Sequence, residues 1–329
     1  MNNNKPMPFA SVLEALFGSD DPPIHLIYRL SDMEDEEFAH FKRAWPTVHE
    51  DRRGVIARHM VDIAEEDYMV DFSPVFAHLF TDEAAGVRQA SLDGIWDSDD
   101  QNLITPILTM LQTDPDVGVR ASAARSLAHY ILLAEWGQFD TSHVEPVVTA
   151  LLTEYENPRA SLEIRRAALE AMAPAPHPRI ADLIHEAYED GPDELQLSAI
   201  FAMGNTADDR WLPILIDELA SPSSDFRAEA ARALGMIGHY DAVDALEDVV
   251  DDAEKEVGMA AVIALGQIGG DRVLELLSRM ADDPDYEEFH DIIDEALEEM
   301  EWVDSNFDML SLTDEEDDDF DLSDDLLLN

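Results

Sequence analysis

The sequence predicts an all-α fold in which about eight helical hairpins stack side by side as a solenoid. The main observation is an internal repeat, because the segments that begin at Phe226, Val257 and Phe289 align without gaps as FRAEAARALG, VGMAAVIALG and FHDIIDEALE. Equivalent positions, which we call the anchors, recur at intervals of 31 to 45 residues. The anchors are Arg53, Arg88, Arg120, Arg165, Gln196, Arg227, Gly258 and His290. A period in this range indicates a stack of small supersecondary units and not one globular core.

The first half of each repeat is predicted to be an amphipathic helix. Three and six residues after most anchors the chain carries small residues, such as Ala230 and Ala233, and seven residues after them it carries Leu, Met or Ile. Offsets of three and seven share one face of a helix, and small residues let a neighbouring helix approach closely. The glycines expected to end these first helices are Gly235, Gly238, Gly266, Gly269 and Gly270.

The second half of each repeat is predicted to be another helix, because apolar residues return at helical spacing. The stretches with this spacing are Leu103–Leu111, Val144–Leu152, Ile180–Ala187, Leu212–Leu219, Ala242–Val249 and Val273–Met280. No segment shows sustained alternation with a period of two, so we expect no sheet.

The repeats are expected to occupy residues 45–302. Residues 1–44 precede them as an N-terminal helical cap, in which Ser31 and Glu34 have the spacing of a capping box. Residues 303–329 are predicted to form an acidic disordered tail, because acidic and apolar residues alternate there. The tail is interpreted either as a solvating end or as a short linear motif. The apolar residues of that motif are Phe320, Leu322, Leu326 and Leu327.

One repeat is irregular, since the step from Arg120 to Arg165 is about a dozen residues too long. The excess lies around residues 130–143 and includes Leu132, Trp136 and Phe139. Insertions in repeat proteins often map to loops on the binding face. The alternative is that these apolar residues extend the core of a longer helix pair.

Two runs carry a family resemblance. One is Asp225-Phe226-Arg227 with Ala230, Ala233, Leu234, Gly235, Ile237 and Gly238, and the other extends from Asp116 through Arg120 to Leu127. They resemble HEAT repeats, in particular the short type named after phycobilisome lyases, and the likeness covers roughly residues 45 to 302. The resemblance implies a right-handed α–α superhelical solenoid. It also implies that the anchor arginines have a structural role, in which each bonds acidic or turn groups of the adjacent repeat.

The composition is strongly acidic, with 74 acidic and 20 basic residues and a formal charge of −54. If the anchor arginines are used internally, the outer surface is more negative still. Nucleic acid and anionic membrane surfaces are then disfavoured as partners, because binding to either depends on Lys and Arg. The acidity fits either a salt-rich cytoplasm or a protein kept soluble by acidic side chains, and the clustering of the acids favours the second.

Several kinds of chemistry are excluded or disfavoured. There is no cysteine, which excludes thiol catalysis, thiolate metal sites and disulfides. No signal peptide and no apolar stretch of membrane-spanning length is evident, so we expect a cytoplasmic protein. No phosphate-binding loop, dinucleotide motif or nucleophile elbow is present. We therefore expect no cofactor and no metal.

Two enzyme groups share the resembling repeat. The deoxyhypusine hydroxylases hold two irons through His-Glu dyads just after the anchor arginine. The pairs His49-Glu50 and His185-Glu186 are out of that register, because His49 lies four residues before Arg53 and His185 lies twenty after Arg165. Bilin lyase subunits are the other group. They have no short catalytic motif to compare with this sequence, so the likeness to them is one of fold alone.

The function predicted from these observations is that of a non-catalytic scaffold or adaptor that binds a protein with a basic surface. The alternatives are a relative of the two enzyme groups and an acidic mimic of nucleic acid. Partner-binding residues are expected at the turn between the paired helices, where aromatic and polar groups gather, with Trp211 as the strongest candidate. These residues are Trp96, Trp136, Asn205, Asp209, Arg210, Trp211, His239 and Tyr240.

Overall fold

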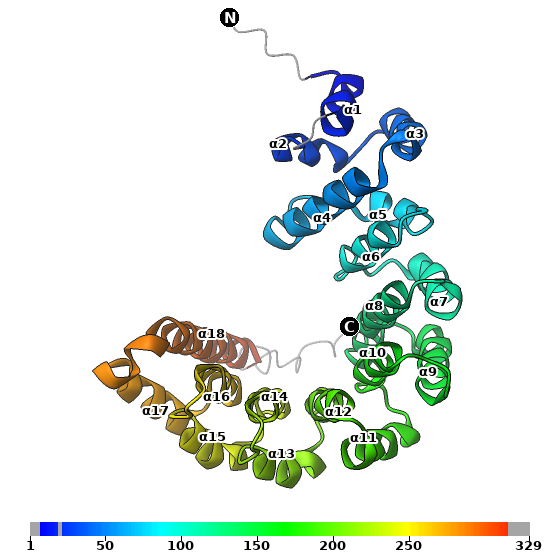
Figure 1. The fold of residues 1–329 in the computed structure, drawn as a ribbon. Coiled ribbons are helices and arrows are strands. Elements are labelled where there is room, and N and C mark those ends of the chain that lie inside the picture. The colour runs from blue at the N-terminus through cyan, green and yellow to red at the C-terminus, as the bar shows by residue number, and fades with distance from the viewer. Residues whose placement is uncertain (1–6, 19–21, 315–329) are drawn as a thin grey trace, which may run out of the picture. The chain divides into compact units, whose positions relative to one another are not determined.

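The computed structural model describes residues 7–18 and 22–314, and side chains among them as far as Trp302. These residues form helices and no strand, which confirms the predicted fold class (Figure 1). The α-helices are α1 (Phe9–Gly18), α2 (Ile24–Ile27), α3 (Asp35–Ala44), α4 (Glu50–Glu66), α5 (Ser73–Leu79), α6 (Ala85–Asp93), α7 (Ile104–Thr113), α8 (Val117–Glu135), α9 (Thr141–Glu156), α10 (Leu162–Met172), α11 (Pro178–Asp190), α12 (Asp193–Asn205), α13 (Leu212–Glu218), α14 (Ser224–Ile237), α15 (Val243–Val249), α16 (Lys255–Ile268), α17 (Asp271–Ala281) and α18 (His290–Asp314). Short 3-10 helices include η4 (Asp209–Trp211) and η5 (Tyr240–Ala242).

The anchors mark the first helix of every repeat. Each anchor from Arg53 to Gly258 is the fourth residue of its helix, and His290 is the first residue of α18. Even-numbered helices from α4 to α18 are therefore the first helices, and the odd-numbered helices α5 to α17 between them are the second helices. The period read from the sequence thus corresponds to a helical hairpin, as predicted.

The chain divides into two compact units, residues 1–202 and 203–329. In the first unit α8 and α10 lie in one layer, while α7, α9 and α11 form the other (Figure 1). In the second unit α14 and α16 lie side by side and are backed by α13, α15 and α17. Each unit buries its apolar residues between these layers, including Ile107 and Leu151 in the first and Leu234 and Leu265 in the second.

The glycines of the repeat separate into two kinds. Gly238 and Gly269 end α14 and α16 at positive φ, as predicted. Gly235 and Gly266 were expected to end these helices too, but both lie inside them. A β-carbon on Gly235 would come within 2.7 Å of the Ala264 backbone, so this glycine permits two first helices to touch.

The N-terminal cap contains α1, α2 and α3, and one prediction about it was wrong. The capping box of α3 is formed by Glu34 and Glu37, since the Glu34 N–H donates to the Glu37 carboxylate at 3.4 Å. Ser31 instead ends the preceding 3-10 helix, and its hydroxyl accepts a hydrogen bond from Asp71 N–H. The Ser31 side chain serves a long-range contact, which sequence spacing does not reveal.

The irregular repeat is explained by a longer helix pair. α8 has 19 residues and α9 has 16, so much of the excess lengthens these two helices. Leu133 and Phe139 are buried, in agreement with the extended core, whereas Trp136 is exposed. At the other end of the chain α18 continues to Asp314, and the predicted boundary at residue 303 falls within it.

Candidate protein-binding site

Three anchor arginines bind an aspartate in the loop that leads to the next helical hairpin. Arg88 donates from Nε and Nη2 to Asp114 at 2.8 and 2.7 Å, and Arg227 binds Asp252 in the same bidentate way at 2.8 Å for both bonds. The guanidinium of Arg53 donates to Asp82 at 2.9 Å. These bonds are of the kind that the resemblance implied for the anchor arginines.

The carboxylates of these pairs also organise the backbone that receives them. One oxygen of Asp82, Asp114 and Asp252 accepts the N–H two residues later, at 2.9 Å in each case. The hydrogen bond that Arg227 donates lowers the pKa of Asp252, and the hydrogen bond that Arg88 donates to Asp114 raises the pKa of Arg88. Both shifts mean that the charged forms are stabilised in the folded chain.

The irregular repeat uses different partners. Arg120 Nη2 binds Glu154 of α9 at 2.6 Å, and its Nε donates to the Leu111 carbonyl. Arg165 donates to the Tyr155 carbonyl at 3.1 Å and lies over the Tyr155 ring. The positive charge of these arginines is directed inward, which leaves the surface acids with fewer basic neighbours.

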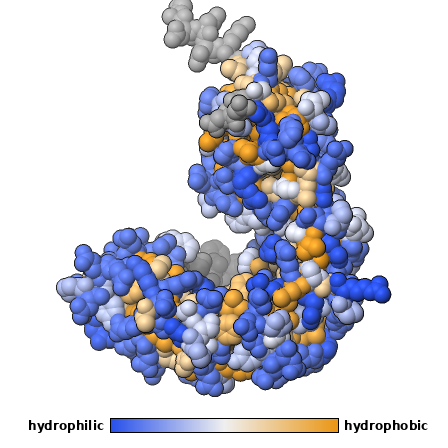
Figure 2. Space-filling view, in the orientation of Figure 1, coloured by the Kyte–Doolittle hydropathy of each residue, from blue (hydrophilic) through white to orange (hydrophobic). Residues whose placement is uncertain are grey.

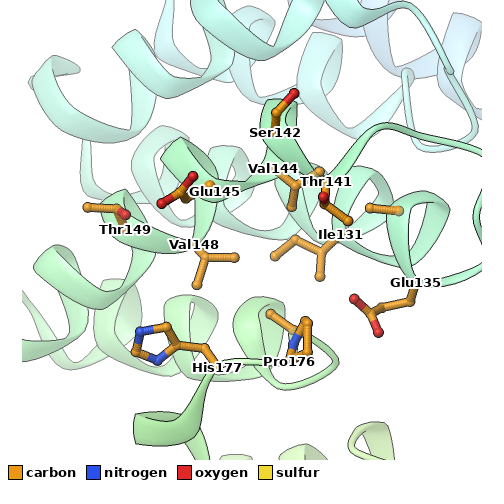
Figure 3. Close-up of a pocket in the computed structure, with 12 residues that line it drawn as sticks. Ile131, Glu135, Thr141, Ser142, Val144, Glu145, Val148, Thr149, Pro176 and His177 are labelled. Atoms are coloured by element: carbon orange, nitrogen blue, oxygen red, sulfur yellow. The ribbon is translucent and has the colours of Figure 1, made fainter.

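A groove opens beside the irregular repeat, between α8, α9 and the loop that follows α10 (Figure 3). Its volume is about 430 Å³, within the range of roughly 300–1,000 Å³ found for ligand pockets. The apolar part of its wall comes from Ile131 and Ala134 of α8, Val144 and Val148 of α9, and Ala175 and Pro176 of the loop. This mixture of three segments exists because the long helices α8 and α9 extend past the shorter α10.

The rim of the groove is acidic and polar. Glu135, from the last turn of α8, and Glu145 of α9 lie on opposite sides of the apolar side chains (Figure 3). Neither carboxylate has a hydrogen bond or ion pair with the described residues. The third side of the groove is His177, which precedes α11 and caps it, because its Nδ1 accepts the Arg179 N–H at 3.3 Å. The groove therefore combines an apolar floor with two uncompensated negative charges.

Three aromatic residues predicted to bind a partner are exposed. Trp96 is 45% exposed, Trp136 is 65% exposed and Tyr240 is 50% exposed. Trp136 directly follows Glu135, so it stands next to a rim residue of the groove in the chain. These side chains are available for contact, as expected at the turn between paired helices.

Trp211 was predicted as the strongest contact residue, and the structure does not support this. Its side chain is 4% exposed, and its Nε1 is buried without a hydrogen-bond partner among the described residues. Trp211 ends η4 directly before Leu212 begins α13, and both side chains turn into the core. The sequence around Trp211 alternates between polar and apolar residues, and this pattern does not determine whether its side chain points outward or into the core.

The remaining predicted residues lie along turns of the second unit. The His239 ring approaches the Asp209 carboxylate at 3.9 Å, so two successive turns meet there. Arg210 binds Asp208 at 2.6 Å and is not available to a partner without breaking that pair. Asn205 is half-buried at the end of α12. The tail residues Phe320, Leu322, Leu326 and Leu327 lie outside the described residues.

The sequence did not single out the groove residues or the exposed pair Tyr68 and Met69, which follows α4. The long step from Arg120 to Arg165 was the signal that pointed toward the groove. No comparable signal marks Tyr68 and Met69, because their repeat has an ordinary length.

The His-Glu pairs occupy structural or surface positions. The His49 side chain caps the start of α4 by accepting the Asp51 N–H, while Glu186 binds Arg179. Among residues 7–18 and 22–302 no group of three His, Asp or Glu side chains is arranged to hold a metal ion. A search of the helices in the described ranges also finds none that is both long and apolar enough to span a membrane.

Comparison with known proteins agrees with this architecture. Residues 212–298 match the family model of HEAT repeats. The complex of CpcE and CpcF of phycocyanin lyase from Nostoc sp. PCC7120 aligns with 91% of this chain and 99% of that chain, at a TM-score of 0.53 and 16% identity.

A curated relative is the deoxyhypusine hydroxylase of Mus musculus, which is 27% identical over 126 residues. That alignment covers 38% of this chain and 42% of the mouse protein, so the chain spans less than half the length of this relative. The repeat period, the anchor pairs and the matched segment lead to one conclusion. Residues 212–298 match HEAT repeats, and the described helices before them repeat the same hairpin unit.

Proposed function

We propose that this chain is a non-catalytic scaffold or adaptor that binds a protein with a basic surface. The observation that carries the proposal is the charge balance: the chain has a formal charge of −54, and anchor arginines are held in pairs with carboxylates. The face seen in Figure 2 is mainly hydrophilic. Such a surface attracts basic proteins over long distances and raises their rate of encounter.

The contact chemistry supports the same function. Trp96, Trp136 and Tyr240 are exposed aromatic side chains, the type that contributes most to protein interfaces. The groove beside α8 and α9 adds an apolar depression with an acidic rim. The phycocyanin lyase neighbour is a complex of two proteins, which fits a fold used for protein partnership.

The same charge balance disfavours nucleic acid as the partner. We also propose that the protein is located in the cytoplasm. A mimic of nucleic acid is the alternative within the class of binding proteins. Duplex DNA would displace the partner of a mimic, because both would occupy the same basic site. A partner that binds elsewhere would stay bound when DNA is added.

The similarity to deoxyhypusine hydroxylase keeps an enzymatic relative as a second candidate. The residues directly after the anchors include Gly54, Gln89 and Ala121, and none of the eight is a histidine. Elemental analysis of the purified protein for iron tests this candidate. Two bound irons for each chain would contradict the scaffold proposal.

Capture from lysate on the immobilised full chain tests the proposed function. We expect a small set of basic proteins that is released as NaCl rises, since screening weakens the attraction. A parallel capture on the chain lacking residues 304–329 separates the solenoid from the tail. Retention of acidic and basic proteins alike, or of no specific protein, would contradict the proposal.

A further inference from the structure

We infer that the groove between α8, α9 and the loop after α10 binds one apolar side chain of a peptide segment that carries Lys or Arg on both sides of it. This inference rests on the proposed function and specifies where and by what chemistry the partner is held. The groove is formed within residues 1–202, and all of its lining residues are described.

The first argument is the shape and composition of the floor. Ile131, Val144 and Val148 point toward the space at the centre of Figure 3, and Pro176 closes it from the opposite loop. A cavity of about 430 Å³ with aliphatic walls suits an aliphatic side chain, because its burial there removes apolar surface from water. An aliphatic residue such as leucine therefore fits the centre of the segment.

The second argument is the contrast between two glutamates of α9. Glu154 is buried and neutralised by Arg120 at 2.6 Å, as expected for a charge inside a protein. Glu145 lies on the same helix at the groove rim, and no described residue neutralises it. A partner cation is the complement that this carboxylate lacks.

The third argument is the position of the two rim carboxylates. Glu135 and Glu145 lie on either side of the apolar floor in Figure 3. A ligand with a single positive charge would satisfy only one of them. A segment with basic residues before and after its apolar residue satisfies both, while an acidic segment is repelled at both ends.

The test uses a short fluorescein-labelled peptide with Lys-Lys-Leu-Lys-Lys at its centre, and fluorescence polarisation at low salt. We expect binding to the full-length chain. Replacement of the leucine by glycine or of the lysines by glutamates should weaken binding at least about tenfold. Equal binding of the leucine and glycine peptides would overturn the inference, because attraction of charge alone would explain it.

Protein variants locate the site. The double variant Glu135→Lys/Glu145→Lys should lose at least about tenfold in affinity, and Val148→Thr, which keeps the shape of the side chain, should lose severalfold. Glu189→Lys is the matched control, because Glu189 is exposed on α11 and does not line the groove. Circular dichroism confirms that each variant is folded.

The outcome also separates this inference from the proposed function. The double rim variant makes two charge reversals and Glu189→Lys makes one. If Glu189→Lys lowers the logarithm of the peptide affinity by half as much as the double rim variant, the groove is not the site, although basic proteins captured by the chain would still support the scaffold. If the peptide binds in the groove but no basic protein is captured, the groove inference stands and the proposed function fails.

Discussion

Arg227 and Asp252 form a bidentate pair in which Nε and Nη2 of the arginine each donate to one carboxylate oxygen at 2.8 Å. The same guanidinium donates to the Ser221 carbonyl at 2.9 Å, and Asp252 accepts the Glu254 N–H. One pair thus joins the first helix of its repeat, the loop before that helix and the start of the next first helix. Loss of either partner leaves several polar groups unsatisfied at once.

The first prediction concerns the strength of this pair. Asp252→Asn removes the negative charge and leaves Arg227, which is largely buried, without its counter-ion. We expect the free energy of unfolding to fall by about 1–3 kcal/mol, measured by urea denaturation. Asp248→Asn is the control, since Asp248 is exposed on α15 and should change stability by less than about 0.5 kcal/mol. Equal effects of the two substitutions would contradict the role of the pair.

The second prediction follows from the lowered pKa of Asp252. A carboxyl group whose pKa is lower in the folded chain stabilises the fold above its unfolded pKa of about 3.9, and this contribution disappears as pH falls through the lowered value. The difference in stability between the native chain and Asp252→Asn should therefore be constant at neutral pH and shrink below pH of about 4. Urea titrations of both proteins across this range measure it. A difference that grows toward acid pH has the wrong sign for this mechanism.

The third prediction concerns salt. A formal charge of −54 makes the folded chain repel itself, and salt screens this repulsion more than it weakens pairs that are largely buried, such as Arg88–Asp114. The melting temperature should rise as NaCl is added. A melting temperature that is flat or falls up to molar NaCl rules this out.

The fourth prediction compares two glycines inside helices. Gly235→Ala places a β-carbon against the Ala264 backbone, so the two first helices must separate, and we expect a loss of about 1–3 kcal/mol. Gly54→Ala in α4 meets nothing within 4 Å and should stabilise the chain by about 0.5–1 kcal/mol. Thermal unfolding of both variants measures the contrast. Equal shifts would mean that close helix contact does not explain Gly235.

The fifth prediction compares two tryptophans. Trp211→Ala removes a buried side chain and should cost about 3–5 kcal/mol, whereas Trp136→Ala should change stability by less than about 0.5 kcal/mol. Denaturation of the two variants measures this directly. A large loss for Trp136→Ala would show that this residue is structural and not a free contact residue.

The repeated fold could be predicted from the sequence because each repeat carries the same local pattern of apolar and small residues around its anchor. The anchors fall at the fourth residue of their helices from Arg53 to Gly258. Six positions after their anchors, Ala233, Ala264 and Ala296 lie against a glycine of the preceding first helix. Helical periodicity and the absence of alternation are local properties, so they determine secondary structure and the hairpin unit. The pairing of the anchor arginines followed from the resemblance.

The candidate site was predicted only in part. The exposure of Trp96, Trp136 and Tyr240 agrees with their place at turns, but Trp211 has a similar place and is buried. Sequence spacing also put the capping box at Ser31, although the Ser31 hydroxyl binds Asp71 forty residues away. Both errors concern the direction in which a side chain points, which depends on the packing of the folded chain and not on spacing along the sequence.

The sequence by itself determined that helical hairpins recur, where they begin, and that the protein carries a large negative charge. Only the tertiary structure decided that Gly235 contacts the neighbouring helix and does not end its own helix. It also decided that α8 and α9 are longer than α10 and leave a groove beside it. The physical reason is that periodicity describes which face of a helix is apolar, whereas a groove depends on the difference in length between helices that pack together.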